Sequence, residues 1–577
     1  MNNADIARVF EEMADLLELR GENAFRVRAY RNGAKTIQEL SESVAEIVQN
    51  DSKDLKSYAG IGATLAEKCV VLVETGGLPQ LEKLKAETPD VLIKMTRIPG
   101  LGAKKAMKLQ EELELTSLED LRKACEEERV RSLKGFAAKT EELILKGLEI
   151  AEAASQRIRI DQAEKLVNRL RLHLEECDSI EKIEFAGSYR RGKESVGDID
   201  ILVVSEDHES VMDRLGDFTG LVSVIVRGET KMSIRVDEQF QVDLRVVPKA
   251  SFGAALQYFT GSKEHNVAVR SRARKLGLTV NEYGVAKLDD PTTYIAGQSE
   301  EDVYKSLGLS WVSPELREGR RELTWAEDEA FPDLVTEADI VADLHMHTTA
   351  SDGSNSIEQM ADAARALGRT HIAITDHSKR VSMANGLDEK RLLDQWQSID
   401  EFNAIQADGF RVLKGVECDI LEDGPLDIAD EVLAEADWVI ASVHYGQKQP
   451  REQITSRIVG ALENPHVDTI AHPTGRLIGS RPPYEVDLQA VFDAAIAHGK
   501  SLELNASPRR LDLSEMHLMQ AAEMGIPITI NTDAHAKEGM SVMRFGITQA
   551  RRAGLTKEQV LNTWDLERLL EWLRSHS

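Results

Sequence analysis

Asp198 and Asp200 are the pair of residues in this chain whose type and spacing most clearly suggest chemistry. They stand at the start of an apolar run, 199–204, that is typical of a buried strand. Because residues i and i+2 share one face of a strand, both carboxylates point the same way and can hold hard divalent cations. Just upstream, Gly187-Ser188 and Arg190-Arg191-Gly192 supply the close backbone approach, hydroxyl and guanidinium groups that a phosphate chain needs. The pattern predicts nucleotidyl transfer with two metal ions.

A third carboxylate strengthens this interpretation. An Asp-x-Asp alone is usually a solvated strand end, so the pair needs support from elsewhere in the chain. Asp243 lies in the alternating run 241–247, which also predicts a strand. We expect this strand to pair antiparallel with the first one and to bring Asp243 beside Asp198 and Asp200.

A second group of candidate ligands lies in the C-terminal half of the chain. From Asp339 onward, six or seven short apolar runs alternate with helical segments, which predicts a β/α barrel. In such barrels the active residues lie at the C-terminal ends of the strands. Nine histidines and acids follow the predicted strands in this way: His345, His347, Asp352, His377, Glu417, His444, His472, Asp533 and His535.

Imidazole together with carboxylate suits Zn²⁺, Mn²⁺ or Fe²⁺, and nine groups are more than one ion can use. The sequence therefore predicts two or three clustered ions that activate water and bind a phosphoryl oxygen. A lone histidine at a strand end is more often structural, but six histidines and three acids placed alike argue against that alternative. Arg476 and Arg481, after His472, either hold a phosphate or are solvated loop arginines.

The first 150 residues have a helical pattern with a recurring glycine phrase. It occurs as Gly60-Ile61-Gly62, as Gly100-Leu101-Gly102 followed by Lys104, and in a looser form at Gly135. A Gly-x-Gly turn that opens a helix aims the helix N-terminal amides at an anion, as helix-hairpin-helix motifs do with a DNA phosphate. Ordinary helix caps are the alternative, but the repetition favours DNA binding.

Size and composition restrict the class of protein. A chain of 577 residues with 42% hydrophobic and 29% charged residues is typical of a soluble protein with three or more domains. It contains no apolar stretch of 18 residues, and its start does not resemble a signal peptide. The four cysteines are scattered, which fits a reducing cytoplasm and excludes cysteine-based zinc ribbons.

The net charge of −28 argues against a long, non-specific electrostatic contact with nucleic acid. Charge acts locally, however, over a Debye length of about 8 Å. Residues 1–150 are nearly balanced in charge, so directed DNA contacts remain possible there. A charged, unpatterned stretch from about Pro314 to Glu337 is expected to be an interdomain linker.

Two families resemble parts of this chain. Residues 187–203, Val242-Asp243 and Tyr258–Ser262 with Asn266 and Arg270 resemble the family X DNA polymerases, and the match continues through residues 277–283. The barrel resembles a polymerase-and-histidinol-phosphatase (PHP) domain through four motifs: His345-x-His347, Asp376-His377, His472-Pro473 and Asp533-x-His535. In this order the two match the long bacterial and archaeal family X polymerases over essentially the whole chain.

The resemblance implies a multidomain α+β and α/β fold, with a helical N-terminal region, a nucleotidyltransferase palm with a flanking subdomain, and a distorted β/α barrel. The expected divisions are 1–85 and 86–155 (helix-hairpin-helix), 156–250 (palm), 251–320 (base-pair checking), 321–338 (linker) and 339–577 (PHP).

The resemblance also implies roles for single residues. The catalytic metal ligands would be Asp198, Asp200 and Asp243, with Mg²⁺ or Mn²⁺ as the ion. Ser188, Arg191 and Gly197 would contact the triphosphate, Tyr258 and Phe259 the sugar, and Asn266 and Arg270 the base pair. Gly60, Gly62, Gly100, Gly102 and Lys104 would contact DNA.

The activity implied is gap filling in DNA repair of the base-excision kind, together with a metal-dependent 3′–5′ exonuclease that also acts at abasic sites. The expected partners are gapped or primed duplex DNA and deoxynucleoside triphosphates. The protein is expected to be a cytoplasmic monomer without a membrane partner. Lys68 matches the lyase lysine of some relatives, but Thr64 and Gln80 replace nearby basic residues, so a surface lysine is expected. The alternatives are a DNA-targeted phosphoesterase with a degraded polymerase and a scaffold that bridges DNA ends.

Overall fold

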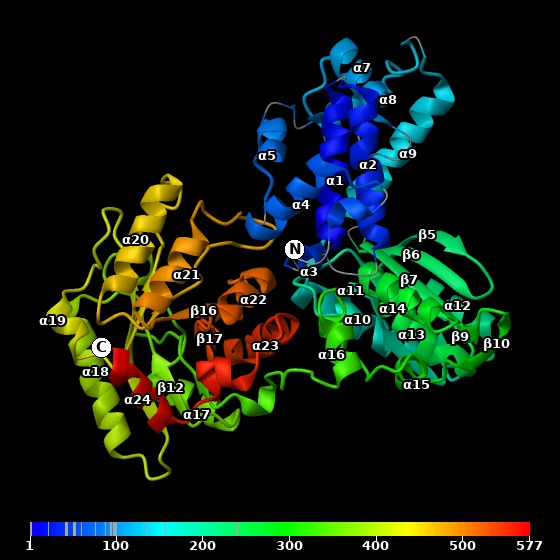
Figure 1. The fold of residues 1–577 in the computed structure, drawn as a ribbon. Coiled ribbons are helices and arrows are strands. Elements are labelled where there is room, and N and C mark those ends of the chain that lie inside the picture. Colours follow the sequence, from blue (N-terminus) through cyan, green and yellow to red (C-terminus); the bar gives the residue numbers. More distant parts are fainter. Residues whose placement is uncertain are drawn as a thin grey trace.

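The computed structural model describes residues 3–20, 22–40, 44–49, 54–58, 60–75, 77–86, 88–89, 91–92, 95, 98, 101–133, 135–155, 157–237 and 240–576. Three bodies are visible in Figure 1: a helical N-terminal region, a central sheet domain with an attached subdomain, and a C-terminal barrel domain. Among the described residues no helix is both long and apolar enough to cross a membrane.

The N-terminal region is built from amphipathic helices around a core of its own. Ile6, Phe10 and Met13 recur at helical spacing on the first helix and are fully buried against the others. The helices are α1 (Asn3–Leu19), α2 (Ala24–Glu39), α3 (Val44–Gln49), α4 (Ala63–Thr75), α5 (Pro79–Ala86), α7 (Ala103–Leu113), α8 (Leu118–Glu126) and α9 (Ala138–Ser155).

The sheet domain contains a five-stranded sheet in the order β2-β4-β7-β6-β5. Its core is formed by the inward residues of these strands and by helix α10, whose Ala163, Val167 and Leu170 are buried. Its elements are β1 (Ile158–Arg159), α10 (Ile160–Glu175), β2 (Lys182–Phe185), α11 (Gly187–Arg190), β3 (Ser195–Val196), β4 (Asp198–Val204), α12 (His208–Gly216), β5 (Leu221–Arg227), β6 (Lys231–Val236) and β7 (Phe240–Val246).

The pairing of the two aspartate-bearing strands corrects the sequence-based expectation. Strands β4 and β7 are parallel, not antiparallel, with Asp200 opposite Asp243. The chain leaves β4 through α12 and returns through the β5–β6 hairpin, and this crossover turns β7 into the same direction as β4. The predicted proximity of the carboxylates was correct, but the predicted direction was wrong.

The subdomain after the sheet has its own small core. It consists of α13 (Phe252–Thr260), α14 (Lys263–Lys275), β8 (Leu278–Asn281), β9 (Gly284–Lys287), β10 (Asp290–Ala296), α15 (Glu300–Ser306) and α16 (Glu322–Asp328). Helix α16 lies within the expected linker, and its Ala326 is buried in this core with Leu323 and Trp325 packed against it. The first half of that linker is therefore part of the subdomain, because its apolar residues are spaced to bury one side of a short helix.

The barrel domain contains seven parallel strands in chain order, β11 to β17. The first and last strands meet through a parallel bridge between Met346 and Ala534, and the His347 amide donates to the Ala534 carbonyl at 2.9 Å. The strands are β11 (Ala342–Asp343), β12 (His371–Ile374), β13 (Arg411–Asp419), β14 (Trp438–Ser442), β15 (Thr469–Ile470), β16 (Ser501–Asn505) and β17 (Ile528–Asn531). The helices are α17 (Ile357–Ala366), α18 (Glu389–Ala404), α19 (Asp430–Leu433), α20 (Arg451–Glu463), α21 (Leu488–Ala497), α22 (Glu515–Glu523), α23 (Met543–Arg552) and α24 (Leu566–His576).

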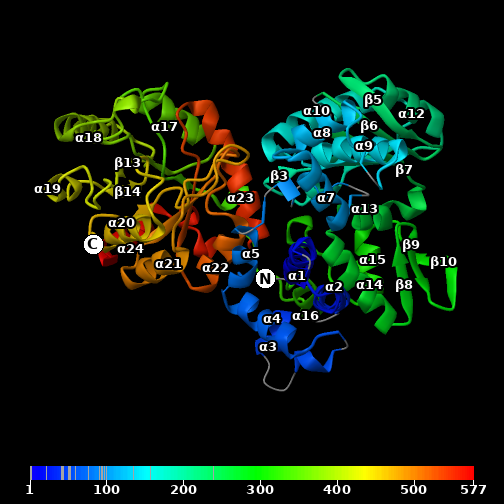
Figure 2. The same cartoon turned by 90° about the horizontal axis from the view of Figure 1, so that it is seen from above.

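The barrel domain packs closely against the sheet domain. Both views place α22 and α23 on the side of the barrel that faces the rest of the chain (Figures 1 and 2). Leu511 and Phe545 of the barrel domain are buried in the hydrophobic core of the sheet domain. Burying each of these side chains contributes about 2 kcal/mol, so the contact is a shared core and more than a polar surface contact.

Candidate functional sites in the sheet and barrel domains

The three aspartates of the sheet domain lie together on one face of β4 and β7. Asp198 and Asp200 alternate with the buried Ile199 and Ile201, and Asp243 lies beside Asp200 in register. The side chain of Asp243 accepts a hydrogen bond from the Gln241 amide at 2.7 Å and another from the Ser233 hydroxyl. Three carboxylates on adjacent strands form an oxygen-rich site suited to hard divalent cations.

The start of the short helix α11 (Gly187–Arg190) fits closely against this site. Gly187 has a φ of +63°, and a Cβ built there would lie 2.3 Å from Asp200 Oδ2. Glycine is therefore required both by the backbone conformation and by the proximity of the carboxylate. The next residue, Ser188, has a buried hydroxyl with no hydrogen-bond partner among the described residues. A buried hydroxyl of this kind is what a phosphate oxygen would satisfy.

The electrostatics of the three carboxylates fit a cation site. Burial, together with the charges of Asp198 and Asp243, raises the pKa of Asp200 to about 7. Burial and Asp243 also raise the pKa of Asp198. Like charges held this close are costly to ionise together, and divalent cations offset that cost.

Arg191 and Gly197, the other expected triphosphate contacts, lie at the two ends of the segment between α11 and β4. The Arg191 guanidinium donates to the Thr260 carbonyl at 2.5 Å and to Glu318 at 3.0 Å. Gly197 lies directly before β4, and a Cβ there would be 3.2 Å from an Arg157 nitrogen. The neighbouring Arg190 forms a two-pronged ion pair with Glu300 at 2.7 and 2.9 Å, which anchors α11 to the subdomain.

The four expected nucleotide contacts of the subdomain lie on α13 and α14. Tyr258 and Phe259 meet edge to face with ring centroids 5.1 Å apart. The Asn266 amide donates to the Tyr258 carbonyl at 2.7 Å, which joins the two helices. Arg270 lies one turn further along α14 and is exposed. These side chains are thus held on one rigid pair of helices.

The barrel brings all nine predicted ligands together, with Glu417 at the centre. One carboxylate oxygen of Glu417 lies 2.8 Å from His377, 3.5 Å from His345 and 3.7 Å from His347. The other oxygen lies 3.1 Å from His472 and 3.5 Å from His444. The remaining acids face the same histidines: Asp533 lies 3.1 Å from His347, and Asp352 lies 3.4 Å from His535 and 3.7 Å from His377.

Ligand atoms from these residues form three overlapping groups that can each hold an ion: His347, Asp352, His377 and His535; His345, His347 and Asp533; and His377, Glu417 and His444. His345 Nε2 and Glu417 Oε2 are buried and have no hydrogen-bond partner among the described residues. Buried imidazole and carboxylate atoms without hydrogen bonds, aimed at one another, fit metal coordination. The residues present therefore fit the two or three clustered ions expected.

Burial and the neighbouring charged groups shift the pKa values of the ligands in this cluster. Burial alone would raise the pKa of Glu417, but the imidazoles of His377, His444 and His345 hold it well below its usual range. Burial and the charge of His377 lower the pKa of His347 to about 4, which keeps its imidazole neutral, as metal binding requires.

Two ligands also carry backbone strain. His472 and Asp533 have φ values of +29° and +55°, a region that non-glycine residues rarely adopt. Such strain persists only where the surrounding structure enforces it, and it gathers at functional sites.

Sequence reasoning missed the residues that orient these ligands. Glu503 accepts from His345 Nδ1 at 2.7 Å and from the His472 amide at 2.7 Å, and Asp419 lies 3.1 Å from His444 Nδ1. Carboxylates that fix the second nitrogen of a histidine set which nitrogen faces the metal. A signal was present, because Glu503 is a lone acid inside an apolar strand and Asp419 shares a strand face with Glu417.

The glycine turns of the N-terminal region are described in part. Gly62 and Gly102 stand directly before α4 and α7, and a Cβ at either would meet no atom within 4 Å. Nothing in the described part of the chain therefore requires glycine there, which suits the approach of an outside partner. Gly100 lies outside the described residues, and so does the side chain of Lys104, although its backbone belongs to α7.

The surroundings of two basic residues add to the expectation. Lys68 is half-buried: its amine donates to Gln80 at 2.5 Å, and burial and the charge of Arg26 lower its pKa. Arg476 is not a solvated loop arginine. It pairs with Glu194 of the sheet domain at 2.7 Å, so it serves the contact between domains.

Comparison with protein-family models divides the chain into five matched regions. Two helix-hairpin-helix models match residues 1–78 and 92–149, and the DNA polymerase beta palm and thumb models match residues 157–245 and 255–318. The PHP domain model matches residues 343–507.

Curated relatives agree with these matches. A protein named DNA polymerase/3′-5′ exonuclease PolX from Bacillus subtilis is 40% identical over 578 residues, which covers 100% of both chains. A probable phosphatase of Thermoanaerobacter sp. is 32% identical over 41% of this chain and 95% of its own. DNA polymerase lambda of Rattus norvegicus is 26% identical over 55% of this chain and 56% of its own. With full-length identity of this order, the chain belongs to the family X DNA polymerases that carry a C-terminal PHP domain.

Proposed function

We propose that this protein is a DNA-directed DNA polymerase that fills short gaps during DNA repair, including base-excision repair, and that its barrel is a metal-dependent 3′–5′ exonuclease. The observation that carries the proposal is the presence of two separate ligand clusters on one chain. One consists of three carboxylates beside the Gly187-Ser188 turn, and the other of nine imidazoles and carboxylates with Glu417 at their centre. The full-length similarity to a polymerase/exonuclease supports both activities.

For the polymerase site we propose Asp198, Asp200 and Asp243 as ligands of two Mg²⁺ or Mn²⁺ ions. When bound, such ions lower the pKa of the primer 3′-hydroxyl and neutralise the leaving pyrophosphate. Ser188 and the turn glycine would receive the phosphates, and Arg191 and Gly197 would complete that contact. Tyr258, Phe259, Asn266 and Arg270 would hold the sugar and check the base pair, because α13 and α14 present them together.

For the barrel we propose that its nine ligands hold two or three Mn²⁺, Zn²⁺ or Fe²⁺ ions. Bound there, the ions supply an activated water and a positive clamp for the phosphodiester oxygen. Glu503 and Asp419 would keep His345 and His444 in the tautomer that faces the ions. We include hydrolysis at abasic sites in this activity, as an extension of the same phosphodiester chemistry.

For DNA binding we propose the turns at Gly60, Gly62, Gly100, Gly102 and Lys104. The open space before Gly62 and Gly102 supports this assignment. The proposed partners are gapped or primed duplex DNA and deoxynucleoside triphosphates, and we propose a cytoplasmic monomer associated with the bacterial nucleoid. We propose the domain division 1–85, 86–155, 156–250, 251–320 and 339–577, with 321–338 as the linker, and the ranges of the five matched family models support it.

A primer-extension and degradation assay on gapped DNA tests the proposal. Asp243→Ala should lower the rate of primer extension by about a thousandfold or more, which corresponds to on the order of several kcal/mol of lost transition-state stabilisation. Mn²⁺-dependent degradation should remain intact. His345→Ala with His347→Ala should do the reverse. Chelation with EDTA should stop both activities. Asp237→Asn is the matched control, because Asp237 lies in the turn directly after β6 and pairs with Arg169.

Each alternative predicts a different result. Extension that persists in Asp243→Ala would contradict the three-carboxylate site, and degradation that persists in the double histidine variant would remove the barrel from the mechanism. A phosphoesterase with a degraded polymerase would show no extension in the wild type. A scaffold that bridges DNA ends would show neither activity.

A further inference from the structure

The loop between α11 and β4 (residues 191–197), which carries the proposed triphosphate contacts Arg191 and Gly197, packs against the barrel domain. Helix α23 lies directly against Gly192, where a Cβ would be 2.2 Å from Thr548 Cγ2. The Gln549 amide donates to the Gly192 carbonyl at 2.8 Å, and the Arg552 guanidinium donates to the Arg191 carbonyl. A helix of the barrel domain thus satisfies two consecutive main-chain carbonyls of the loop.

Arg552 also fixes the side chain of Arg191. One oxygen of Glu318 accepts from Arg552 at 2.8 Å and from Arg191 Nε at 3.0 Å. The guanidinium of Arg191 is held on its other side by the Thr260 carbonyl at 2.5 Å. Arg191 is therefore fixed at its main chain directly by Arg552, and at its side chain through Glu318.

The charges around Arg552 form a buried network. Arg552 is fully buried and pairs with Glu515 at 2.7 Å as well as with Glu318. Lys193 lies 3.3 Å from Glu318 and 3.8 Å from Glu515, and Arg320 lies 2.6 Å from Glu515. Burial alone would raise the pKa of Glu318, but Arg552, Arg191 and Lys193 hold it well below its usual range.

The network contains more cations than carboxylates. Arg191, Lys193, Arg320 and Arg552 face Glu318 and Glu515, so removing one cation still leaves each carboxylate a partner. Replacing Arg552 with an apolar residue of similar length therefore avoids the large penalty of an unpaired buried charge. This makes Arg552 suitable for substitution.

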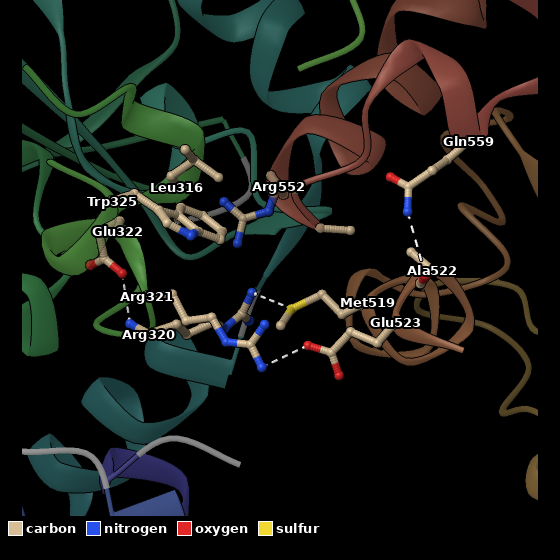
Figure 3. Close-up of a pocket in the computed structure, with 12 residues that line it drawn as sticks. Leu316, Arg320, Arg321, Glu322, Trp325, Met519, Ala522, Glu523, Arg552 and Gln559 are labelled. Carbon is tan, nitrogen blue, oxygen red and sulfur yellow. Dashed lines mark hydrogen bonds and ion pairs between the residues drawn. The ribbon is translucent and has the colours of Figure 1, made fainter. Parts of the chain in front are cut away.

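Figure 3 shows the surroundings of this contact. Arg552 extends from α23 beside Leu316 and Trp325, and Arg320 and Arg321 reach across toward Met519 and Glu523 of α22. The segment after α15 and the barrel helices thus enclose the network from both sides. The three arginines that line the pocket drawn in Figure 3, Arg320, Arg321 and Arg552, all make contacts between the domains.

We propose that Arg552 and Gln549 are positioning residues of the polymerase site, through which the exonuclease domain holds the triphosphate-binding loop in its nucleotide-ready conformation. The inference rests on the proposed polymerase function. Neither residue is among the proposed nucleotide contacts; Arg552 acts through Arg191 and Gln549 acts through Gly192. A preorganised loop does not need to be ordered when the nucleotide binds, so its loss should appear mainly as weaker nucleotide binding.

The test is single-nucleotide insertion on gapped DNA by the full-length protein. Arg552→Met and Gln549→Ala should each raise the KM for the deoxynucleoside triphosphate by about tenfold, as the loss of a buried hydrogen bond to the loop implies, with most of the change in KM and little in kcat. Mn²⁺-dependent degradation of single-stranded DNA should remain at the wild-type rate. Thermal unfolding shows whether each variant folds, and Gln549→Ala, which removes no charge, decides the matter if Arg552→Met does not fold.

Two matched controls lie on the same helix. Arg544→Met removes an ion pair with Glu164 of the sheet domain, and Arg551→Met removes one with Glu315, but neither residue contacts the loop. Both should keep the wild-type KM. If either control raises KM as much as Arg552→Met, general domain docking explains the effect and the inference is overturned. It is also overturned if the wild type extends primers while Gln549→Ala keeps the wild-type KM; a wild type without extension instead contradicts the proposed function.

Discussion

At the scale of single residues, a few carboxylates organise both sites. Glu417 lies within 3.7 Å of five histidines, so one side chain connects ligands from most strands of the barrel. Behind these ligands, Glu503 holds His345 and the backbone of His472. The affinity of the barrel site for metal ions therefore depends also on residues that are not themselves proposed ligands.

We expect Glu503→Gln to weaken metal binding in the barrel by about 10- to 100-fold, because the amide cannot orient His345 as a carboxylate does. Degradation of DNA should then require correspondingly more Mn²⁺, while primer extension stays unchanged. A Mn²⁺ titration of both activities measures this. Asp468→Asn is the matched control, since Asp468 is half-buried in the same domain but accepts a hydrogen bond from the Val439 amide of β14. An unchanged Mn²⁺ requirement in Glu503→Gln would contradict the role assigned to it.

At the scale of elements, the parallel pairing of β4 with β7 and the first turn of α11 build the proposed polymerase site. Register places Asp243 beside Asp200, and the left-handed conformation of Gly187 lets the turn approach within contact distance of that carboxylate. A shift of one residue in either strand would turn its aspartates to the opposite face. The site thus depends on strand register as much as on the identity of its residues.

Gly187→Ala should lower primer extension by about 100-fold or more, because the added methyl would displace Asp200 or the turn by about an ångström. Gly409→Ala is the control for backbone strain alone: Gly409 has a φ of +80°, but a Cβ there meets no atom within 4 Å. This control should lose about 1 kcal/mol of stability and keep full extension. Extension assays and thermal unfolding separate the two effects, and equal activity in both variants would show that the close approach is unimportant.

At the scale of the whole molecule, buried ion pairs join the parts of the chain. Glu300 of the subdomain binds Arg190 of the sheet domain and the fully buried Arg317. Burial alone would raise the pKa of Glu300, but these two arginines lower it to about 2. A carboxyl whose pKa is lower in the folded state stabilises the fold above its unfolded pKa of about 4.5, and this contribution disappears as the pH falls toward 2.

The wild type should therefore lose about 3 kcal/mol more local stability between pH 5 and pH 2 than Glu300→Gln does. Hydrogen exchange of peptides covering residues 300–318 measures the local opening free energy. Glu301→Gln, an exposed neighbour in the same helical turn, should behave like the wild type. Parallel pH curves for the wild type and Glu300→Gln would contradict the assignment.

Both clusters of candidate metal ligands could be predicted from the sequence alone. The period-two placement of Asp198 and Asp200 and the position of nine ligands after apolar strands are local patterns, and local backbone geometry sets where such side chains point. The direction of β7 could not be predicted, because it depends on a crossover of more than thirty residues between the strands. The helical first half of the expected linker was obscured by its charged surface residues.

The sequence by itself determined which residues are candidates for binding metals, phosphates and DNA, since that candidacy depends on side-chain type and spacing. Only the tertiary structure decided which residues support them. Glu503 lies 158 positions from the histidine that it orients, and Arg552 lies 361 positions from the loop that it holds. The physical reason is that a buried polar group takes whatever partner the packing of distant elements brings within hydrogen-bond distance, and spacing along the chain carries no trace of that choice.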